Sequence, residues 1–164
     1  MTTRPEKGQT APAIVLPAFP DANVTLGGGK RGQVVFFYPK DNTPGCTNEA
    51  KDFTALKSEF DSAGFDLIGV SKDSLKKHQN FTEKHSLGVT LASDSDGVAC
   101  EAYGVWIEKT MYGKKYMGIE RSTFLISADG SILEVWRKVK VKGHAEDVLS
   151  LAQSAQKLTT GATC

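Results

Sequence analysis

The chain has 164 residues, 40% of them hydrophobic, and its twenty basic and nineteen acidic side chains leave a formal net charge of +1. This length fits one domain with a single core, and the balanced charge creates no field that would attract nucleic acid or anionic lipid. Three scattered cysteines are too few for a disulfide scaffold and lack the spacing of a zinc site. We therefore expect a reducing compartment, the cytoplasm, and no metal or other cofactor.

The N-terminal region predicts a β-hairpin. Residues 1–12 are polar and acid-containing, and Pro17 interrupts the apolar segment 13–19, so we expect neither a signal peptide nor a membrane span. Strand-like residues 14–17 and 24–26 enclose a segment with strong turn chemistry. The glycine-rich residues 27–30 lack the Gly-Lys-Ser/Thr ending of a phosphate-binding loop and precede a strand, so we interpret them as a flexible turn.

Strands then alternate with amphipathic helices. Apolar residues recur at helical spacing after Pro44 until Gly64, which predicts one continuous helix. We expect core strands at residues 34–38, 65–71, 121–126 and 132–136. We expect further helices at residues 74–85, in a short segment ending at Tyr103, and at 143–158. The alternation indicates a parallel crossover unit, and an Asp-Gly turn at 127–130 indicates an antiparallel pair that closes the sheet.

Three stretches lie outside these core elements. Residues 105–120 show no stable period, so we predict an exposed loop. The basic alternation in residues 137–142 lacks interleaved aromatic residues and indicates a solvated edge protected by lysines rather than a nucleic-acid patch. Residues 159–164 are small and polar, which predicts a flexible tail after a single domain of residues 1–158.

Cys46 lies at a strand-to-helix junction, where α/β proteins place their ligands. Pro44 suits the first helical position, which makes Thr43 the N-cap and Cys46 the third helical residue. There the sulfur lies among unpaired backbone N–H groups at the positive end of the helix dipole, which favours thiolate over thiol. A lone cysteine is often a small core residue, but the neighbours here are glycine and polar residues. We therefore predict a nucleophile.

The order β, α, β, α, β, β, α, with this cysteine on the first core helix, predicts an α/β thioredoxin-like fold. We expect a central mixed β-sheet flanked by helices, with the N-terminal hairpin as an extension. A thioredoxin active site needs a second cysteine three residues away, but positions 43 and 49 are Thr and Glu. Local dithiol exchange is therefore excluded.

The chain contains a Pro-x-x-x-Thr-x-x-Cys motif, formed by Pro39, Thr43 and Cys46. With this motif it resembles the peroxiredoxin family, specifically its bacterioferritin-comigratory protein or PrxQ subgroup. The similarity spans nearly the whole chain, including residues 102–106, 120–126 and 136–144. The resemblance implies that Arg121 is the active-site arginine, a role that its position alone does not indicate. It further suggests that Glu49 orients this arginine.

The resemblance implies a thiol peroxidase that reduces hydrogen peroxide and organic hydroperoxides in antioxidant defence. The Cys46 thiolate would attack a peroxide oxygen and become a sulfenic acid. Thr43, Arg121 and the helix-start amides would hold the peroxide and stabilise the leaving oxygen, while Pro39 would limit water access. The resemblance also suggests a monomer or weak homodimer, recycled by thioredoxin or another thiol donor.

Two other uses of Cys46 are open. A cysteine hydrolase would need a histidine base, for which His78, His85 and His144 are available. We expect the first two on either side of a polar helix face and the third at the start of the last helix, and no local triad signature accompanies them. A peroxide-sensing redox protein would use the same thiol without multiple turnover.

The chain departs from the family at the resolving cysteine. Many members place it five residues after the peroxidatic one, where Lys51 stands, and others place it on the next helix, where residues 80–83 contain no cysteine. Cys100 has small apolar neighbours that indicate a packing role, and Cys164 lies in the predicted tail. We therefore expect neither to resolve the sulfenic acid, so that an external thiol attacks Cys46 directly.

Overall fold

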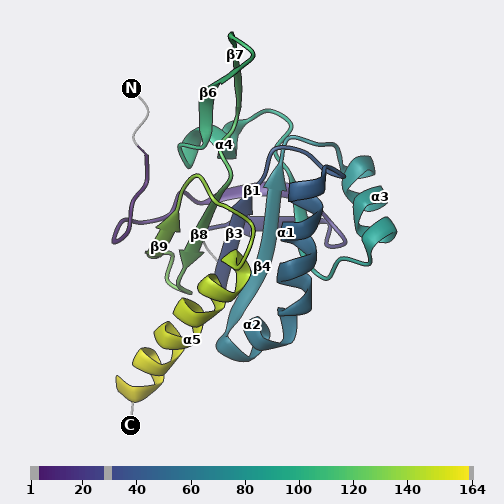
Figure 1. Ribbon diagram of the computed structural model, residues 1–164. Coiled ribbons are helices and arrows are strands. Elements are labelled where there is room, and N and C mark those ends of the chain that lie inside the picture. The colour runs from purple at the N-terminus through teal and green to yellow at the C-terminus, as the bar shows by residue number, and fades with distance from the viewer. Residues whose placement is uncertain (1–3, 28–30, 163–164) are drawn as a thin grey trace.

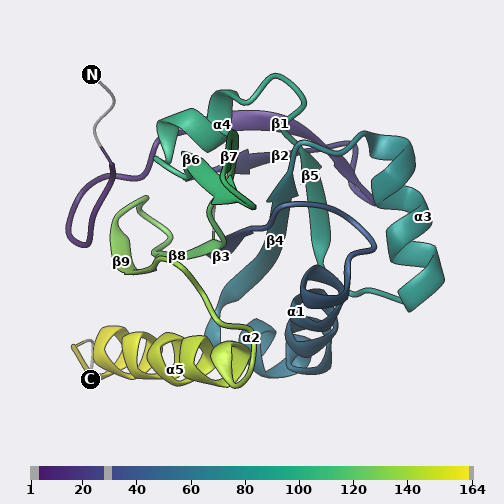
Figure 2. The ribbon, with the colours of Figure 1, turned by 45° about the horizontal axis from the view of Figure 1, so that its top comes forward.

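The computed structural model describes residues 4–27 and 31–162, and it has a mixed seven-stranded sheet with helices on both faces (Figures 1 and 2). In spatial order the strands are β2 (Asn23–Leu26), β1 (Ile14–Phe19), β5 (Thr90–Ser93), β4 (Phe65–Ser71), β3 (Gly32–Phe37), β8 (Ser122–Ile126) and β9 (Ile132–Trp136). Strands β3, β4 and β5 are parallel, and the other pairs are antiparallel. The expected central mixed sheet and N-terminal hairpin are therefore present. Strand β5 was not predicted.

The helices cover the sheet unevenly. They are α1 (Pro44–Ala55), α2 (Lys57–Ala63), α3 (Leu75–His85), α4 (Val98–Ala102) and α5 (His144–Ala162). In Figure 2, α1, α2 and α5 lie below the sheet, α4 lies above it and α3 lies on the right, where it contacts β1 and β5. The two faces of the sheet are thus buried against different elements, as expected for a strand such as β3 in which all six residues are buried.

The sheet separates two hydrophobic clusters. Side chains alternate along β3, so Val34 and Phe36 pack in one cluster while Val35 and Phe37 pack in the other. The first cluster contains Cys46 and residues of α1, α2 and α5. The second contains Cys100 together with other residues of α4 and with residues of the N-terminal hairpin. Two of the three cysteines therefore lie on opposite faces of the sheet.

The single helix predicted between Pro44 and Gly64 is wrong, because the helix is interrupted at Leu56. This residue has φ −102° and ψ 10°, ends α1 and begins α2. Its N–H donates to the carbonyl of Phe53 at 3.1 Å in a tight turn, while its side chain still packs against the first cluster. The apolar spacing continues through the break, which is why periodicity did not reveal it.

The exposed loop predicted for residues 105–120 is also wrong. Strands β6 (Trp106–Met111) and β7 (Lys114–Ile119) form a separate antiparallel hairpin that extends from the body of the protein (Figure 1). Tyr112 and Gly113 have φ values of 53° and 78°, and positive φ at both central residues is typical of two-residue hairpin turns. Most side chains of β7 are exposed, so the alternation of a half-buried strand is missing.

Residues 159–162 were predicted to belong to a flexible tail. They are helical, because α5 continues to Ala162. Cys164 and residues 28–30 of the predicted glycine-rich turn lie outside the described residues. The lysines of residues 137–142 are exposed as expected, but β9 ends at Trp136, so this segment connects β9 to α5 and is not a strand edge. In the described part of the chain, no helix combines the length and apolar character needed to cross a bilayer.

Candidate active site

Cys46 occupies the helical position expected from the sequence. Thr43 is the N-cap, with φ −91° and ψ 152°, and Pro44 follows in the first turn. The carbonyl of Thr43 accepts the first helical hydrogen bond, from Thr47 N–H at 2.8 Å. The Cys46 side chain is nearly buried, with 2% of the residue exposed, and packs at the edge of the first cluster.

Arg121, directly before β8, connects Cys46 to Glu49. Its Nη2 donates to Cys46 Sγ at 3.3 Å and its Nη1 donates to Glu49 Oε1 at 2.7 Å. Burial alone would lower the pKa of Arg121, but the neighbouring Glu49 and Cys46 hold it above its ordinary value. The guanidinium therefore stays cationic beside the sulfur, with Nη2 3.3 Å from Sγ.

Glu49 is almost completely buried in α1. Burial raises the pKa of its carboxyl to about 7, even though Arg121 acts in the opposite direction. Oε1 accepts from Arg121, whereas Oε2 has no hydrogen-bond partner among the described residues. A buried carboxylate with one uncompensated oxygen is costly, which explains why desolvation outweighs the ion pair.

Gly45 makes room for this arrangement. A Cβ atom on Gly45 would lie 3.2 Å from Arg121 Nη2, closer than an ordinary van der Waals contact. The absence of a side chain thus lets the guanidinium lie against the first turn of α1. No role for Gly45 was predicted from the sequence. The signal was present, since glycine is a poor helix former placed directly before the predicted nucleophile.

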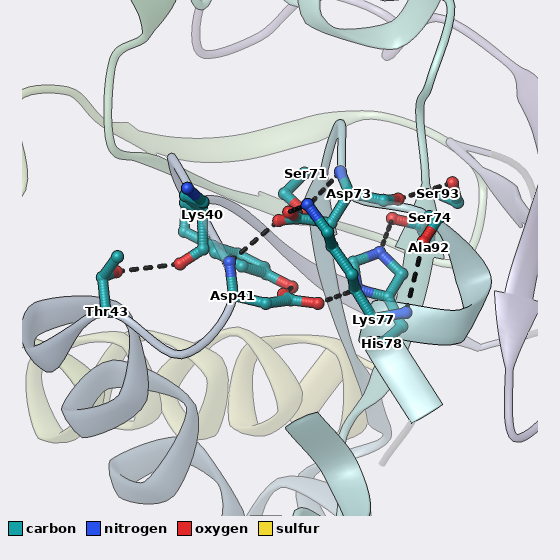
Figure 3. Close-up of polar contacts among 11 residues, drawn as sticks. Lys40, Asp41, Thr43, Ser71, Asp73, Ser74, Lys77, His78, Ala92 and Ser93 are labelled. Atoms are coloured by element: carbon teal, nitrogen blue, oxygen red, sulfur yellow. Dashed lines mark hydrogen bonds and ion pairs between the residues drawn. The ribbon is translucent and has the colours of Figure 1, made fainter. Parts of the chain in front are cut away.

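Thr43 and Pro39 lie in the loop between β3 and α1. The Thr43 hydroxyl donates to the carbonyl of Lys40 at 2.8 Å and makes no capping bond to the helix (Figure 3). The hydroxyl proton is used in this hydrogen bond, so the Thr43 oxygen can only accept further hydrogen bonds. Pro39 directly follows the buried Tyr38 and is itself exposed.

The three histidines all have partners other than Cys46 in the described structure. His78 was expected at a polar helix face, which is wrong: it is fully buried and contacts Asp41 and the Ala92 carbonyl. His85 is half-buried, with Nε2 3.1 Å from Asn42 Oδ1.

His144 begins α5 as predicted, and its Nε2 lies 2.7 Å from Thr123 Oγ1. Burial lowers the pKa of His144 to about 4, so the ring is neutral at physiological pH. Within the described residues no histidine forms a hydrogen bond to the Cys46 sulfur, which leaves the hydrolase hypothesis without a base.

Cys100 has the properties of a packing residue. It is fully buried in α4 and its backbone N–H donates to Asp94 Oδ2 at 2.8 Å. Burial, together with Asp94, raises the pKa of the Cys100 thiol well above its usual value. Cys46 and Cys100 are both free thiols, and the sheet lies between them.

Comparison with solved structures places the chain in a known class of protein. The chain superposes on Xanthomonas campestris Peroxiredoxin Q with a TM-score of 0.84 and 45% identity, covering 95% of this chain and 99% of the other. A Cys-to-Ser mutant of Xylella fastidiosa PrxQ gives a TM-score of 0.86 and 39% identity, covering 94% and 99%. These matches confirm the thioredoxin-like fold and the class of protein, a peroxiredoxin.

The chain belongs to the AhpC/TSA family, whose family model matches residues 7–135. It is 53% identical to Peroxiredoxin Bcp of Xanthomonas campestris over 124 residues, which cover 76% of this chain and 78% of that protein. It is 47% identical to Peroxiredoxin Bcp of Bacillus subtilis over 145 residues, 88% of this chain and 92% of that protein. The resemblance found in the sequence is therefore confirmed at the level of the Bcp and PrxQ proteins.

Proposed function

We propose that Cys46 is the residue with which this thiol peroxidase reduces peroxides. The observation that carries the proposal is the 3.3 Å contact from Arg121 Nη2 to Cys46 Sγ, with the guanidinium held on its other side by Glu49. A fixed cation beside the sulfur stabilises the attacking thiolate and can stabilise negative charge that develops on a departing oxygen.

The reaction follows from these groups. The Cys46 thiolate attacks one peroxide oxygen, an S–O bond forms and the O–O bond breaks. The sulfur is oxidised to sulfenic acid, and the departing alkoxide or hydroxide takes a proton from water to leave as an alcohol or as water. Arg121 stabilises the departing oxygen, and Thr43, whose hydroxyl proton is directed at Lys40, accepts a hydrogen bond from the peroxide. Pro39 lies in the same loop, and we assign it the role of limiting water access to the sulfur.

The proposed substrates are hydrogen peroxide and organic hydroperoxides. A solved structure of Xanthomonas campestris bacterioferritin comigratory protein, 44% identical to this chain, is described in connection with that protein's alkyl peroxide reduction activity. The similarity supports the same substrate class here.

We further propose that an external thiol, such as that of thioredoxin, recycles Cys46. The donor thiolate attacks the sulfenic sulfur, an S–S bond forms and the S–O bond breaks, and the departing hydroxide takes up the proton that the donor thiol released and leaves as water. A second donor thiol then reduces the mixed disulfide. The burial of Cys100 on the opposite face of the sheet supports this route over an internal disulfide. The free thiols of Cys46 and Cys100 support a cytoplasmic location, and we propose a monomer or weak homodimer.

Steady-state peroxide consumption tests the proposal. Wild-type protein supplied with thioredoxin, thioredoxin reductase and NADPH should consume many equivalents of peroxide, whereas a folded Cys46→Ser protein should consume none above background. Consumption by Cys46→Ser at the wild-type rate would refute the role of Cys46. A wild-type protein that consumes one equivalent and then stops with each of several thiol donors would favour the alternative of a peroxide-sensing redox protein.

A further inference from the structure

A buried chain of polar side chains lies behind the loop that precedes Cys46 (Figure 3). The Tyr38 hydroxyl donates to Asp41 Oδ1 at 2.6 Å, and Asp41 Oδ2 lies 2.7 Å from His78 Nδ1. The last hydrogen bond of this network joins His78 Nε2 to the carbonyl of Ala92 in β5, at 2.9 Å. Tyr38, Asp41 and His78 are 1%, 6% and 0% exposed, so these hydrogen bonds are shielded from water.

The partners of His78 define where its protons lie. A backbone carbonyl can only accept, so Nε2 carries a proton and donates it to Ala92. One further proton then lies between Nδ1 and the carboxyl of Asp41. Burial raises the pKa of Tyr38, so its hydroxyl stays protonated and donates to the other carboxyl oxygen. The side-chain polar atoms of Tyr38, Asp41 and His78 therefore all have hydrogen-bond partners, as a rigid buried network requires.

The main chain of Asp41 is held as firmly as its side chain. Its N–H donates to Asp73 Oδ2 at 2.8 Å, and Asp73 is itself fixed by Ser71 Oγ at 2.7 Å. Ser93 Oγ in β5 donates to the carbonyl of Asp73 at 2.7 Å. The loop is thus tied to the carboxyl ends of two neighbouring parallel strands, β4 and β5. Asn42, next in the chain, has φ 61°, an uncommon conformation that persists when surrounding contacts impose it.

This anchor lies two residues before Thr43, which is proposed to contact the substrate. The carbonyl of Lys40, the residue before Asp41, accepts the hydrogen bond of the Thr43 hydroxyl at 2.8 Å. The position of the Lys40 carbonyl is set by the fixed Asp41, so the same contacts set the direction of the Thr43 hydroxyl. The network thereby reaches the active site without contacting Cys46.

We propose that His78 is a positioning residue, which acts through Asp41 to hold the loop between β3 and α1 in the conformation that reacts with peroxide. The inference rests on the proposed function of Cys46. When the network is broken, the loop loses its fixed conformation, and Thr43 is no longer held at the position from which it contacts peroxide. Loss of alignment between reacting groups lowers a rate strongly even when each group is still present.

Two reagents separate this role from a general effect on folding. Reaction of Cys46 with hydrogen peroxide needs the aligned Thr43, whereas alkylation by iodoacetamide needs only an accessible thiolate. Because Cys46 is 2% exposed, a looser loop should leave the alkylation rate unchanged or raise it. A positioning role therefore predicts a fall in the first rate without a fall in the second.

The structure offers a matched control. Tyr38→Phe removes the hydroxyl that donates to Asp41, and Tyr103→Phe removes one that donates to the carbonyl of Pro12 at 2.7 Å. Both tyrosines are no more than 1% exposed, but Tyr103 lies in the second cluster, on the other side of the sheet from Cys46. The pair compares the loss of one buried hydroxyl with and without loss of the loop anchor.

The experiment measures both rates in folded wild-type, His78→Gln, Tyr38→Phe and Tyr103→Phe proteins. We expect the peroxide rate to fall about tenfold or more in the first two variants, with the iodoacetamide rate unchanged or higher, and we expect the control to keep both rates within about twofold. If His78→Gln does not fold, the peroxide and iodoacetamide rates of Tyr38→Phe alone test the inference. Wild-type peroxide rates in the folded anchor variants, or equal falls in both rates, would overturn the inference. Wild-type protein that reacts no faster than free cysteine would instead overturn the proposed function.

Discussion

Arg121 and Glu49 form a 2.7 Å ion pair in which the Glu49 side chain is only 1% exposed. The two residues are 72 positions apart and join α1 to the segment before β8. Because one edge of the guanidinium is held by Glu49, the other can be directed at Cys46 Sγ. Both contacts use the planar fork of arginine.

Arg121→Lys should lower the rate of Cys46 oxidation by about a hundredfold, although the positive charge is kept. A lysine ammonium cannot contact Glu49 and Cys46 from two directions as the guanidinium does. The measurement is the second-order rate constant with hydrogen peroxide. Arg137→Lys is the control, because Arg137 is also partly buried but donates to backbone carbonyls, including those of Pro5 and Gly104. Similar rates for both variants would contradict the assigned role.

Gly45→Ala should lower the oxidation rate without lowering stability. Alanine is favoured over glycine in helices by up to about 1 kcal/mol, so α1 should be no less stable. Its Cβ atom, however, would lie 3.2 Å from Arg121 Nη2 and displace the guanidinium. We expect a severalfold slower reaction with peroxide and an equal or higher midpoint of urea unfolding. An unchanged rate would mean that the approach of Arg121 to the first turn is not needed.

The raised pKa of Glu49 predicts a pH-dependent stability difference. Folded Glu49 keeps its proton up to a pKa of about 7, against 4.5 as the ordinary value, so between these limits the folded state binds more protons than the unfolded state. Its contribution to the free energy of unfolding is therefore fully present below pH 4.5 and is lost as pH rises through 7.

Urea unfolding of wild-type and Glu49→Gln proteins from pH 4.5 to 8 measures this contribution. The wild-type value minus the variant value should decrease by up to about 3 kcal/mol across the range. The lowered pKa of His144, caused first by burial, has the opposite effect, but it is present in both proteins and cancels in the difference. A constant or increasing difference would contradict the raised pKa of Glu49.

Cys100→Ser should keep turnover near the wild-type value when an external thiol donor is present. Cys100 is fully buried and lies across the sheet from Cys46, so an internal disulfide would require extensive opening of the structure. The assay is peroxide consumption with thioredoxin, compared at equal folded concentration. A loss of about tenfold or more, with the fold intact, would show that Cys100 participates in turnover.

The position of Cys46 could be predicted because its signals are local. A buried strand, Pro44 at the first helical position and Thr43 as N-cap all lie within thirteen residues, and each acts on its immediate neighbours. The contact between Cys46 and Arg121 spans 75 positions and was implied only by family resemblance. No local pattern marks such a partner.

The errors also have local causes. The hairpin of β6 and β7 was missed because both of its faces are largely exposed, so burial imposes no alternation on its sequence. His78 was placed at a polar helix face because its neighbours in α3 are polar, whereas its own burial depends on Asp41, 37 positions away. The hairpin therefore leaves no period in the sequence, and the burial of His78 depends on a distant partner that the sequence does not show.

The most direct test of the central claim is identification of the oxidised residue. Wild-type protein receives one equivalent of hydrogen peroxide in the presence of dimedone, and non-reducing peptide mass spectrometry locates the adduct. We predict dimedone on Cys46 in most molecules, and none on Cys100. Unmodified Cys46, or a disulfide from Cys46 to Cys100 or Cys164 in most molecules, would contradict the claim that Cys46 forms a sulfenic acid and waits for an external thiol.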